Sequence, residues 1–556
     1  EKRRRRKRGL MEDPKKRVVI NKDVCEGCGD CSVQSNCVSI EPLETELGRK
    51  RKINQSNCNK DYSCIKGFCP SFVTVDAEIK NNTRFKDLGE LPEPQFKTKQ
   101  DINNIMLTGI GGTGVLTISA ILAYAAHYEG KDASVLDMTG LAQKGGAVWS
   151  NIKIFEKNNK PYSQKIAPGA ANVLLACDGV VGTKPEIQEV ISKEKTIAVL
   201  NSNTIPVADF ITQRDIDFKN NDVFQMLENT TNKIISSVPA INISEKLSGD
   251  AIGTNMLMLG SAYQNGLIPL KAENIFKAIE LNGIGIERNI YNFNLGRLYT
   301  INPNHEIFSF LAENEVLNLN SIELFEDRLK RIENYDQRVV DDFIRDKNTI
   351  DQILSEEADT ENITKEAIKE LYRVYAIKDE YEVARMHLES TSKILDSTFT
   401  AWNNLKFYLS PPIISFIKDK RTQRPIKIAI PGYIALPIFK ILKSMKFLRG
   451  TIFDPLNLTE DRRRDKEHKA VFRDKLAEIS NLITGVKSNK LLELIEASKE
   501  VKGYGPVRAE SYEIFKSRIN FTSKKGLRVL RNIFRFKTRN NIQAKKHKAQ
   551  KENRAE

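Results

Sequence analysis

The sequence lacks long hydrophobic runs. None of its 556 residues belongs to a stretch of eighteen consecutive apolar residues, and two prolines and a glycine interrupt the most apolar segment, Ile428 to Phe439. A membrane-spanning helix needs about 20 apolar residues, so we expect no membrane contact. The basic start is not followed by an apolar secretory segment either, which predicts a cytoplasmic protein. The chain begins with Glu1 rather than Met, which suggests a piece of a longer reading frame.

Histidine is also scarce. The chain has five histidines, and each stands alone in a polar or helical context, without a cysteine or carboxylate at catalytic spacing. We therefore expect surface or packing roles for them, and the sequence identifies no catalytic residue. The five are His127, His305, His387, His468 and His547.

The net charge of +15 is concentrated at the two ends of the chain. Residues 1–17, which include RRRRKR, carry +7 and residues 516–556 carry +12, so residues 18–515 carry −4. A nearly neutral body argues against a broad nucleic-acid-binding surface. We expect a solvated leader and a disordered basic tail. The tail mixes Phe, Leu and Ile with its charges, so docking on an acidic surface or RNA is the alternative.

Cysteine is confined to one stretch. Seven of the eight cysteines lie between Cys25 and Cys69, and the next 107 residues contain none. A reducing cytoplasm keeps thiols free, so a disulfide framework is not expected, and clustered thiols there usually bind metal. The eighth, Cys177, lies in an apolar strand-like run and is predicted to be a buried structural thiol.

The first set of cysteines has the spacing of an iron–sulfur ligand loop. Cys25, Cys28 and Cys31 form C-x-x-C-x-x-C, and Cys69 is followed by Pro70. In ferredoxins such a loop presents three thiolates to a cluster, and a distant Cys-Pro supplies the fourth. A zinc ribbon would instead need two separate cysteine pairs. We predict a 4Fe–4S cluster held by these four cysteines.

The second set leaves alternatives open. In ferredoxins the fourth cysteine of such a run binds the other cluster, so Cys37 would bind a second cluster together with Cys58 and Cys64. That cluster would have only three thiolate ligands. A second cluster could be 3Fe–4S, or a 4Fe–4S cluster with a non-thiol ligand such as the nearby Asp61, or could be missing.

Composition divides the chain into six segments and predicts a multidomain protein of mixed α/β and α+β class. Residues 101–300 alternate strand-like and helix-like runs, which is typical of a largely parallel sheet covered by helices. The segments are a basic leader (1–15), a small ferredoxin-like iron–sulfur domain (16–80), a linker (81–100), a three-layer α/β domain with a glycine-rich loop (101–300), a mostly helical C-terminal domain (301–515) and a basic tail (516–556).

The segment NIMLTGIGGTGVLTIS contains a glycine-rich loop of the G-x-G-x-x-G type between a strand pattern and a helix pattern. Glycines there let the backbone approach a pyrophosphate at a helix N-terminus. Asp137 ends a later strand-like run, where a dinucleotide-binding domain places its ribose-binding acid. A second loop, in LAQKGGAVW, is not required by such folds and suggests a surface adapted to another partner. The predicted cofactor-binding residues are Gly109, Gly111, Gly112, Thr113, Gly114, Lys144, Gly145 and Gly146.

Three blocks of sequence carry a family resemblance. The run VCEGCGDCSVQSNCVSIEPLETELGRKRKINQSNCNKDYSCIKGFCPSFVTV resembles the iron–sulfur segment of the fused indolepyruvate:ferredoxin oxidoreductases. LTGIGGTGVLTIS through LAQKGGAVWSNIKI, with NMLMLGSAYQNGLIPL and IELNGIGIERNIYNFNLGR, resembles the gamma domain of the 2-oxoacid:ferredoxin oxidoreductase family. DEYEVARM, LRGTIFDPL and KGYGPVRAE are similar to the helical extension of the same fused enzymes.

The resemblance implies an oxidoreductase that converts an aryl-pyruvate, CoA and oxidised ferredoxin to an aryl-acetyl-CoA, CO2 and reduced ferredoxin. Thiamine diphosphate with Mg forms the carbanion in such enzymes, and iron–sulfur clusters remove its electrons singly. This sequence contains no thiamine-binding motif, so the resemblance implies the electron-exit and gamma modules without the thiamine domains.

The same resemblance assigns partners. The first cluster would exchange electrons with ferredoxin, and the two glycine loops would pack near the thiamine or CoA region of the missing thiamine-diphosphate domains. The physiological 2-oxoacid and a homo-oligomeric state are left open. Two other functions are alternatives: a diaphorase-like subunit linked to NAD(P)H or flavin, and a basic iron–sulfur protein that binds nucleic acid.

Overall fold

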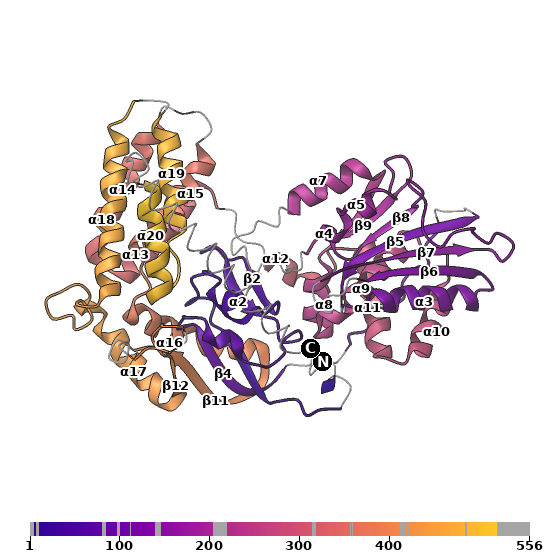
Figure 1. Cartoon of the computed structure of the whole chain (residues 1–556), viewed down its shortest axis with the longest axis horizontal. Coiled ribbons are helices and arrows are strands. Elements are labelled where there is room, and N and C mark those ends of the chain that lie inside the picture. Colours follow the sequence, from indigo (N-terminus) through magenta and orange to yellow (C-terminus); the bar gives the residue numbers. More distant parts are fainter. Residues whose placement is uncertain are drawn as a thin grey trace, which may run out of the picture.

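We describe the protein from a computed structural model (Figure 1). Three regions are visible: an α/β body, a helical bundle, and between them a small domain that contains the clustered cysteines. Among the described helices, none is long and apolar enough to cross a membrane. The structure describes residues 5–6, 10–79, 85–96, 101–111, 113–139, 146–203, 220–313, 319–355, 357, 360–411, 417–420, 422–483 and 486–519. Most of the basic leader, and the tail from residue 520 onward, lie outside them.

The α/β body is built on a six-stranded sheet in the order β10-β9-β8-β5-β7-β6. The first four strands in that order are parallel, and β7 runs antiparallel to both of its neighbours. The strands are β5 (Ile102–Ile110), β6 (Asp132–Thr139), β7 (Ala147–Phe155), β8 (Val173–Ala176), β9 (Ile197–Asn201) and β10 (Lys233–Val238). The alternating pattern predicted a largely parallel sheet, and the antiparallel β7 is an addition to that prediction.

Helices cover both faces of this sheet because the strands are apolar on both sides. Along β5, Ile105 and Leu107 face one core, and Met106 between them faces the other. The first face carries α3 (Val115–Tyr128), α8 (Ala240–Ser248), α9 (Thr254–Gln264), α10 (Ala272–Asn282) and α11 (Ile286–Ile301), and the second carries α4 (Gly179–Gly182), α5 (Pro185–Gln188) and α7 (Asn220–Thr230). The body therefore has three layers.

Helices α9 and α11 approach each other closely. A Cβ on Gly260 of α9 would lie 1.9 Å from the backbone oxygen of Phe293, and one on Gly296 of α11 would lie 1.9 Å from that of Leu257. Only glycine fits at these two positions. Residues 85–96 cross the same region without helix or strand, and Phe85 stacks on Tyr291 with 4.5 Å between ring centroids.

The C-terminal region is helical, as its amphipathic pattern predicts. Residues such as Phe343, Leu371, Phe472 and Leu491 form a separate buried core of the bundle. The helices are α12 (Phe310–Glu313), α13 (Ser321–Tyr335), α14 (Val340–Leu354), α15 (Glu361–Tyr375), α16 (Glu380–Thr398), α17 (Gly432–Ser444), α18 (Glu460–Ser480), α19 (Lys487–Lys499) and α20 (Gly505–Ile519).

The cysteine-rich domain shares a sheet with this C-terminal region. Its elements are β1 (Lys16–Ile20), α2 (Asp30–Ser35), β2 (Ile40–Leu43), β3 (Lys50–Ile53), the 3-10 turn η1 (Ser63–Lys66) and β4 (Phe72–Ile79). Strands β11 (Phe399–Leu409) and β12 (Ile428–Pro431) extend the pair to β1-β4-β11-β12. Segments 16–79 and 399–431, which lie far apart in the sequence, therefore contribute to one sheet.

Candidate metal centre

The first group of thiols comes from three places in the fold. Cys25 and Cys28 lie in the loop after β1, Cys31 lies in the first turn of α2, and Cys69 lies just before β4. Burial raises the pKa of Cys28, and negative charge on Cys69 and Cys25 raises it further. Burial and the other three thiols likewise raise the pKa of Cys31. The fold thus brings the four cysteines of the predicted first cluster into one electrostatically coupled group.

The loop that presents these thiols is shaped by its backbone. Gly27 and Gly29 adopt the left-handed conformation, with φ of 70° and 72°, and a Cβ at Gly27 would lie 2.1 Å from the backbone oxygen of Arg49. The Gly27 N–H donates to Cys25 Sγ at 3.3 Å. The Asp30 N–H donates to Cys28, and the Ser71 N–H donates to Cys69 Sγ at 3.4 Å. Such bonds stabilise thiolates, the form that binds metal.

The second group contains the remaining three clustered cysteines. Burial raises the pKa of Cys64 to about 12, and negative charge on Cys58, Cys37 and Asp61 also raises it. Burial raises the pKa of Cys58 as well, again with Cys37 and Asp61 among the charges that act on it. The Lys60 N–H donates to Cys58 Sγ at 3.3 Å. Cys37, Cys58 and Cys64 therefore form a group of their own, together with the Asp61 carboxylate.

Lysine side chains from the C-terminal region reach the first group. Lys427 Nζ donates to the backbone oxygens of Ile65 at 2.9 Å and Gly67 at 2.7 Å. Burial lowers the pKa of Lys427 to about 8, although negative charge on Cys69 and Cys31 opposes that shift. A buried ammonium in this place offsets the negative charge that grouped thiolates carry.

A second buried cluster of charges lies beside Cys25. Lys378 Nζ donates to the backbone oxygen of Cys25 at 3.0 Å and forms a 2.9 Å ion pair with Glu26. Burial alone would raise the pKa of Glu26, but the charges of Lys378 and Lys50 lower it to about 2. Burial and repulsion by Lys378 lower the pKa of Lys50 to about 7.

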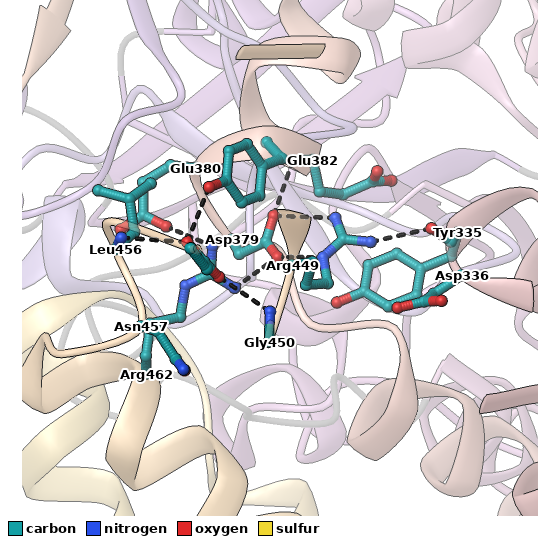
Figure 2. A network of polar contacts seen from close by, with 12 residues as sticks. Tyr335, Asp336, Asp379, Glu380, Glu382, Arg449, Gly450, Leu456, Asn457 and Arg462 are labelled. Atoms are coloured by element: carbon teal, nitrogen blue, oxygen red, sulfur yellow. Dashed lines mark hydrogen bonds and ion pairs between the residues drawn. The ribbon is translucent and has the colours of Figure 1, made fainter. Parts of the chain in front are cut away.

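A network of ionic contacts fixes the start of α16, next to Lys378. Figure 2 shows Arg449 and Arg462 converging on Asp379, which is completely buried; Asp379 Oδ2 lies 2.5 Å from Arg449 Nε and from Arg462 Nη1. Asp379 Oδ1 also accepts the Glu382 N–H at 2.9 Å, which caps the helix. The network holds Lys378 in position over Cys25.

The segment KGYGPVRAE lies against the same thiols. Tyr504 Oη donates to the backbone oxygen of Val24 at 2.6 Å. A Cβ on Gly503 would lie 3.3 Å from the Cβ of Cys28, so this backbone passes directly over the ligand loop. Sequence reasoning did not identify Lys427, Lys378 or Tyr504 as part of the site, because they lie in no ligand motif and reach it only through tertiary structure.

No group of three or more His, Cys, Asp or Glu side chains in the described ranges is arranged to hold a metal ion. A mononuclear zinc site draws its thiolates to about 2.3 Å from one centre. An iron–sulfur cube instead binds each thiolate to a different iron, so its ligands stand further apart. The clustered cysteines of this chain, some buried and some partly buried, supply the thiolate donors that iron–sulfur clusters take.

The glycine-rich loop lies between β5 and α3, as predicted. Gly114 begins the helix with φ of 98°, and a Cβ on Gly109 would lie 2.5 Å from Val115 Cγ2. Asn255 Nδ2 donates to the backbone oxygen of Thr113 at 3.0 Å. The Gly111 N–H donates to the backbone oxygen of Gly146 at 2.7 Å, so the two predicted glycine loops touch. Gly112, Lys144 and Gly145 lie outside the described residues.

The structure does not support a ribose-binding role for Asp137. Strand β7 separates β5 from β6, so Asp137 does not lie on the strand next to the glycine loop, as a dinucleotide site requires. Ser119 donates to Asp137 Oδ1 at 3.0 Å, and Ser150 donates to the same oxygen. The carboxylate thus links α3 to β7. Cys177 is buried, as predicted.

Two family matches account for most of the chain. Residues 104–299 match the family described as pyruvate ferredoxin/flavodoxin oxidoreductase, and residues 323–520 match a family of unknown function, DUF6537.

Curated relatives match about a third of the chain. Indolepyruvate oxidoreductase subunit IorB from Archaeoglobus fulgidus is 28% identical over 177 residues, which are 32% of this chain and 83% of that protein. The protein of the same name from Methanothermobacter thermautotrophicus is 26% identical over 183 residues, 32% of this chain and 87% of that protein.

Solved structures also resemble part of the chain. Pyruvate oxidoreductase subunit PORC from Thermotoga maritima has a TM-score of 0.25 and 19% identity, covering 36% of this chain and 96% of that one. A 2-oxoglutarate:ferredoxin oxidoreductase from Magnetococcus marinus has a TM-score of 0.27 and 15% identity, covering 36% of this chain and 32% of that one.

The family model and the curated relatives agree on a class of redox-enzyme subunit for one part of the chain. Residues 104–299 are similar to the 2-oxoacid:ferredoxin oxidoreductases.

Proposed function

We propose that this chain is the electron-transfer and gamma portion of an enzyme that oxidises indolepyruvate or a related aryl-pyruvate to the aryl-acetyl-CoA in a reducing, cytoplasmic compartment. One observation supports the proposal: the seven cysteines between Cys25 and Cys69 fold into two groups of thiols, as a relay of two clusters would require. Bound iron–sulfur clusters would supply single-electron transfer.

The residues of the chain have distinct roles in this proposal. Cys25, Cys28, Cys31 and Cys69 hold a 4Fe–4S cluster, and Cys37, Cys58 and Cys64 hold a second one. Lys427 and Lys378 offset the negative charge of the first group and exclude water from it. They are positioning residues, because their contacts are to backbone oxygens and to Glu26.

The glycine loops serve a different partner. The N-terminus of α3 offers backbone N–H groups to an anion, which suits the pyrophosphate of CoA. Thiamine diphosphate and Mg belong to partner domains or subunits in this proposal, and ferredoxin is the acceptor. The separation of β5 from β6 by β7 disfavours the NAD(P)H-linked alternative.

Anaerobic purification followed by iron and sulfide analysis and EPR tests the proposal. We expect about eight irons per chain for two cubes, and oxidation of the dithionite-reduced chain by ferredoxin in stopped-flow mixing. Cys31→Ser should lose the EPR signal of the first cluster. Cys177→Ala, which removes a buried thiol outside both groups, should keep it. Zinc in place of iron, or a reduced chain that ferredoxin does not reoxidise, would overturn the proposal.

A further inference from the structure

We propose that Asp61 is the fourth protein ligand of the second cluster, completing a site with Cys37, Cys58 and Cys64. The inference rests on the proposed function, because it assumes that the chain holds two clusters. It concerns a residue of the loop between Cys58 and Cys64, which has the sequence CNKDYSC.

The two ligand loops have the same spacing. Cys25, Cys28 and Cys31 stand three positions apart, with two residues between neighbours, and Cys58, Asp61 and Cys64 repeat that spacing. Asp61 therefore stands at the position that Cys28 occupies in the first loop. Spacing alone is weak support, since any acid between two cysteines could match it by chance.

The backbone conformations of the two loops also match. The residues two and four positions after the first cysteine are left-handed in both loops. In the first loop they are Gly27 and Gly29, with φ of 70° and 72°. In the second they are Lys60 and Tyr62, with φ of 57° and 59°. Left-handed conformations are uncommon and costly for residues other than glycine, so the second loop keeps the fold of the first at an energetic cost.

The hydrogen bonds repeat as well. The N–H two residues after the first cysteine donates to its sulfur at 3.3 Å in both loops, from Gly27 to Cys25 and from Lys60 to Cys58. A second hydrogen bond runs from a backbone N–H to the side chain two residues earlier, at the middle position of the loop. The Asp30 N–H donates to Cys28 in the first loop, as described above.

In the second loop the corresponding bond reaches an oxygen instead of a sulfur. The Ser63 N–H donates to Asp61 Oδ1 at 3.1 Å, and the Ser63 hydroxyl donates to the same oxygen at 2.8 Å. The Asp61 carboxylate thus occupies the place of the Cys28 thiolate in the hydrogen-bond pattern.

Both loops end in the same way. Gly29 precedes α2, and Cys31 is the second residue of that helix. Tyr62 precedes η1, and Cys64 is its second residue. The Asp61 side chain is exposed, and its negative charge acts on both Cys58 and Cys64. Spacing, conformation and hydrogen bonds place a carboxylate where the sister loop has a ligand.

An oxygen ligand makes one iron of the cluster exchangeable. Thiolate is the softer ligand and suits iron–sulfur clusters, whereas carboxylate holds iron less firmly. Ferricyanide should therefore take one electron from the second 4Fe–4S cluster, which then releases the iron at Asp61 as Fe²⁺ and becomes a 3Fe–4S cluster. Added Fe²⁺ and dithionite, which returns the electron, should rebuild the cube.

The experiment compares the full-length wild-type chain with Asp61→Cys and Asp61→Ala, each loaded with iron and sulfide anaerobically and then treated with ferricyanide. The wild type should hold about eight irons, fall to about seven and gain the EPR signal of a 3Fe–4S cluster. Asp61→Cys should resist this loss, and Asp61→Ala should hold about seven irons before oxidation and not take up the eighth. Asp87→Ala, which removes an exposed carboxylate bonded to the Gly89 N–H at 3.0 Å, should behave like the wild type.

The first cluster serves as an internal standard in every sample, because its EPR signal reports correct folding. If wild type and Asp61→Cys lose iron equally, Asp61 is not a ligand although the two-cluster function stands. If the wild type holds about four irons, the second cluster and its Asp61 ligand are both excluded. If no variant takes up iron, the proposed function itself fails.

Discussion

Val73 of β4 pairs with Phe407 of β11, although the two residues lie far apart in the sequence. Phe407 is fully buried and packs edge-on against His387 and Phe439, with ring centroids 4.9 Å and 5.0 Å away. Val73 lies four residues after Cys69. The sheet that follows Cys69, the last cysteine of the first group, is therefore completed by strands from the C-terminal region.

This pairing predicts that Phe407→Ala will destabilise the cysteine-rich domain. Removing a buried phenylalanine ring costs about 3–5 kcal/mol because of lost burial and the cavity left behind. Urea unfolding followed by circular dichroism measures the loss, and visible absorbance measures the retained clusters. Both signals should shift to lower urea together.

Phe447→Ala is the matched control, since that ring is 69% exposed and its removal should change stability little. Should Phe407→Ala unfold the bundle earlier while the clusters persist to the wild-type urea concentration, the two regions would not form one cooperative unit.

The grouping of the cysteines could be predicted from the sequence because they lie close together along the chain. Cys25, Cys28 and Cys31 lie within seven consecutive residues, and so short a segment cannot separate its thiols widely. The assignment of Cys37 to the second group depended on the ligand pattern of two-cluster ferredoxins. The fold places Cys37 beside Cys58 and Cys64. That these groups bind clusters stays a prediction.

Other features depend on pairing across long distances, which local patterns do not encode. The segment FTAWNNLKFYL has strand-like residues, but its partner β4 lies more than 300 residues earlier in the sequence. No local pattern indicates that β7 inserts between β5 and β6. Lys427 reaches the ligand loops only because β12 joins this sheet, so its role was not predicted.

The network in Figure 2 predicts that Asp379→Ala will be strongly destabilising. The substitution leaves the guanidinium groups of Arg449 and Arg462 buried beside each other without their shared carboxylate. Breaking a buried ion pair in this way costs about 3–5 kcal/mol. Thermal or urea unfolding of the full-length chain measures the change.

Asp461→Ala provides the comparison for this prediction. Asp461 pairs with Arg464 at 2.6 Å on the surface of α18 and is 53% exposed, so its removal should cost less than about 1 kcal/mol. Equal losses for the two variants would contradict the importance of the buried network.

His468 predicts a loss of stability in acid. The ring is buried between α18, α19 and α20, with Nε2 3.2 Å from Ser498 Oγ. Burial, with repulsion from Arg508 and Arg373, lowers the pKa of His468 from 6.5 to about 3. The unfolded chain therefore binds a proton between pH 6.5 and about 3 that the folded chain does not, so stability falls as pH falls through that window.

The effect of His468 protonation on stability is measured as the difference in unfolding free energy between the wild type and His468→Gln from pH 7 to pH 4. Below pH 6.5 the unfolding free energy of the wild type should fall relative to that of His468→Gln, by at most about 1.4 kcal/mol per pH unit. His127→Gln, which changes an exposed histidine of α3, should leave the pH dependence intact. A constant difference for His468→Gln would show that its protonation is not linked to folding.

Lys427 predicts an electrostatic effect on the first cluster. Its ammonium is buried beside the ligand loops, over the ring of Phe72 at 4.8 Å and bonded to the backbone oxygens of Ile65 and Gly67. A nearby positive charge favours the reduced, more negative cluster. Lys427→Met should therefore lower the midpoint potential of the first cluster by an amount on the order of tens of millivolts. Lys427→Arg, which keeps the positive charge, should leave that potential close to the wild-type value.

EPR-monitored redox titration of the loaded chain measures this potential, and Lys440→Met on the exposed side of α17 is the control for a lost lysine. A purely structural role for Lys427 would lower cluster content without changing the potential of the clusters that remain. A lower potential in Lys427→Met with unchanged iron content therefore separates the electrostatic role from a structural one. An unchanged potential would mean that the protein screens the ammonium from the cluster.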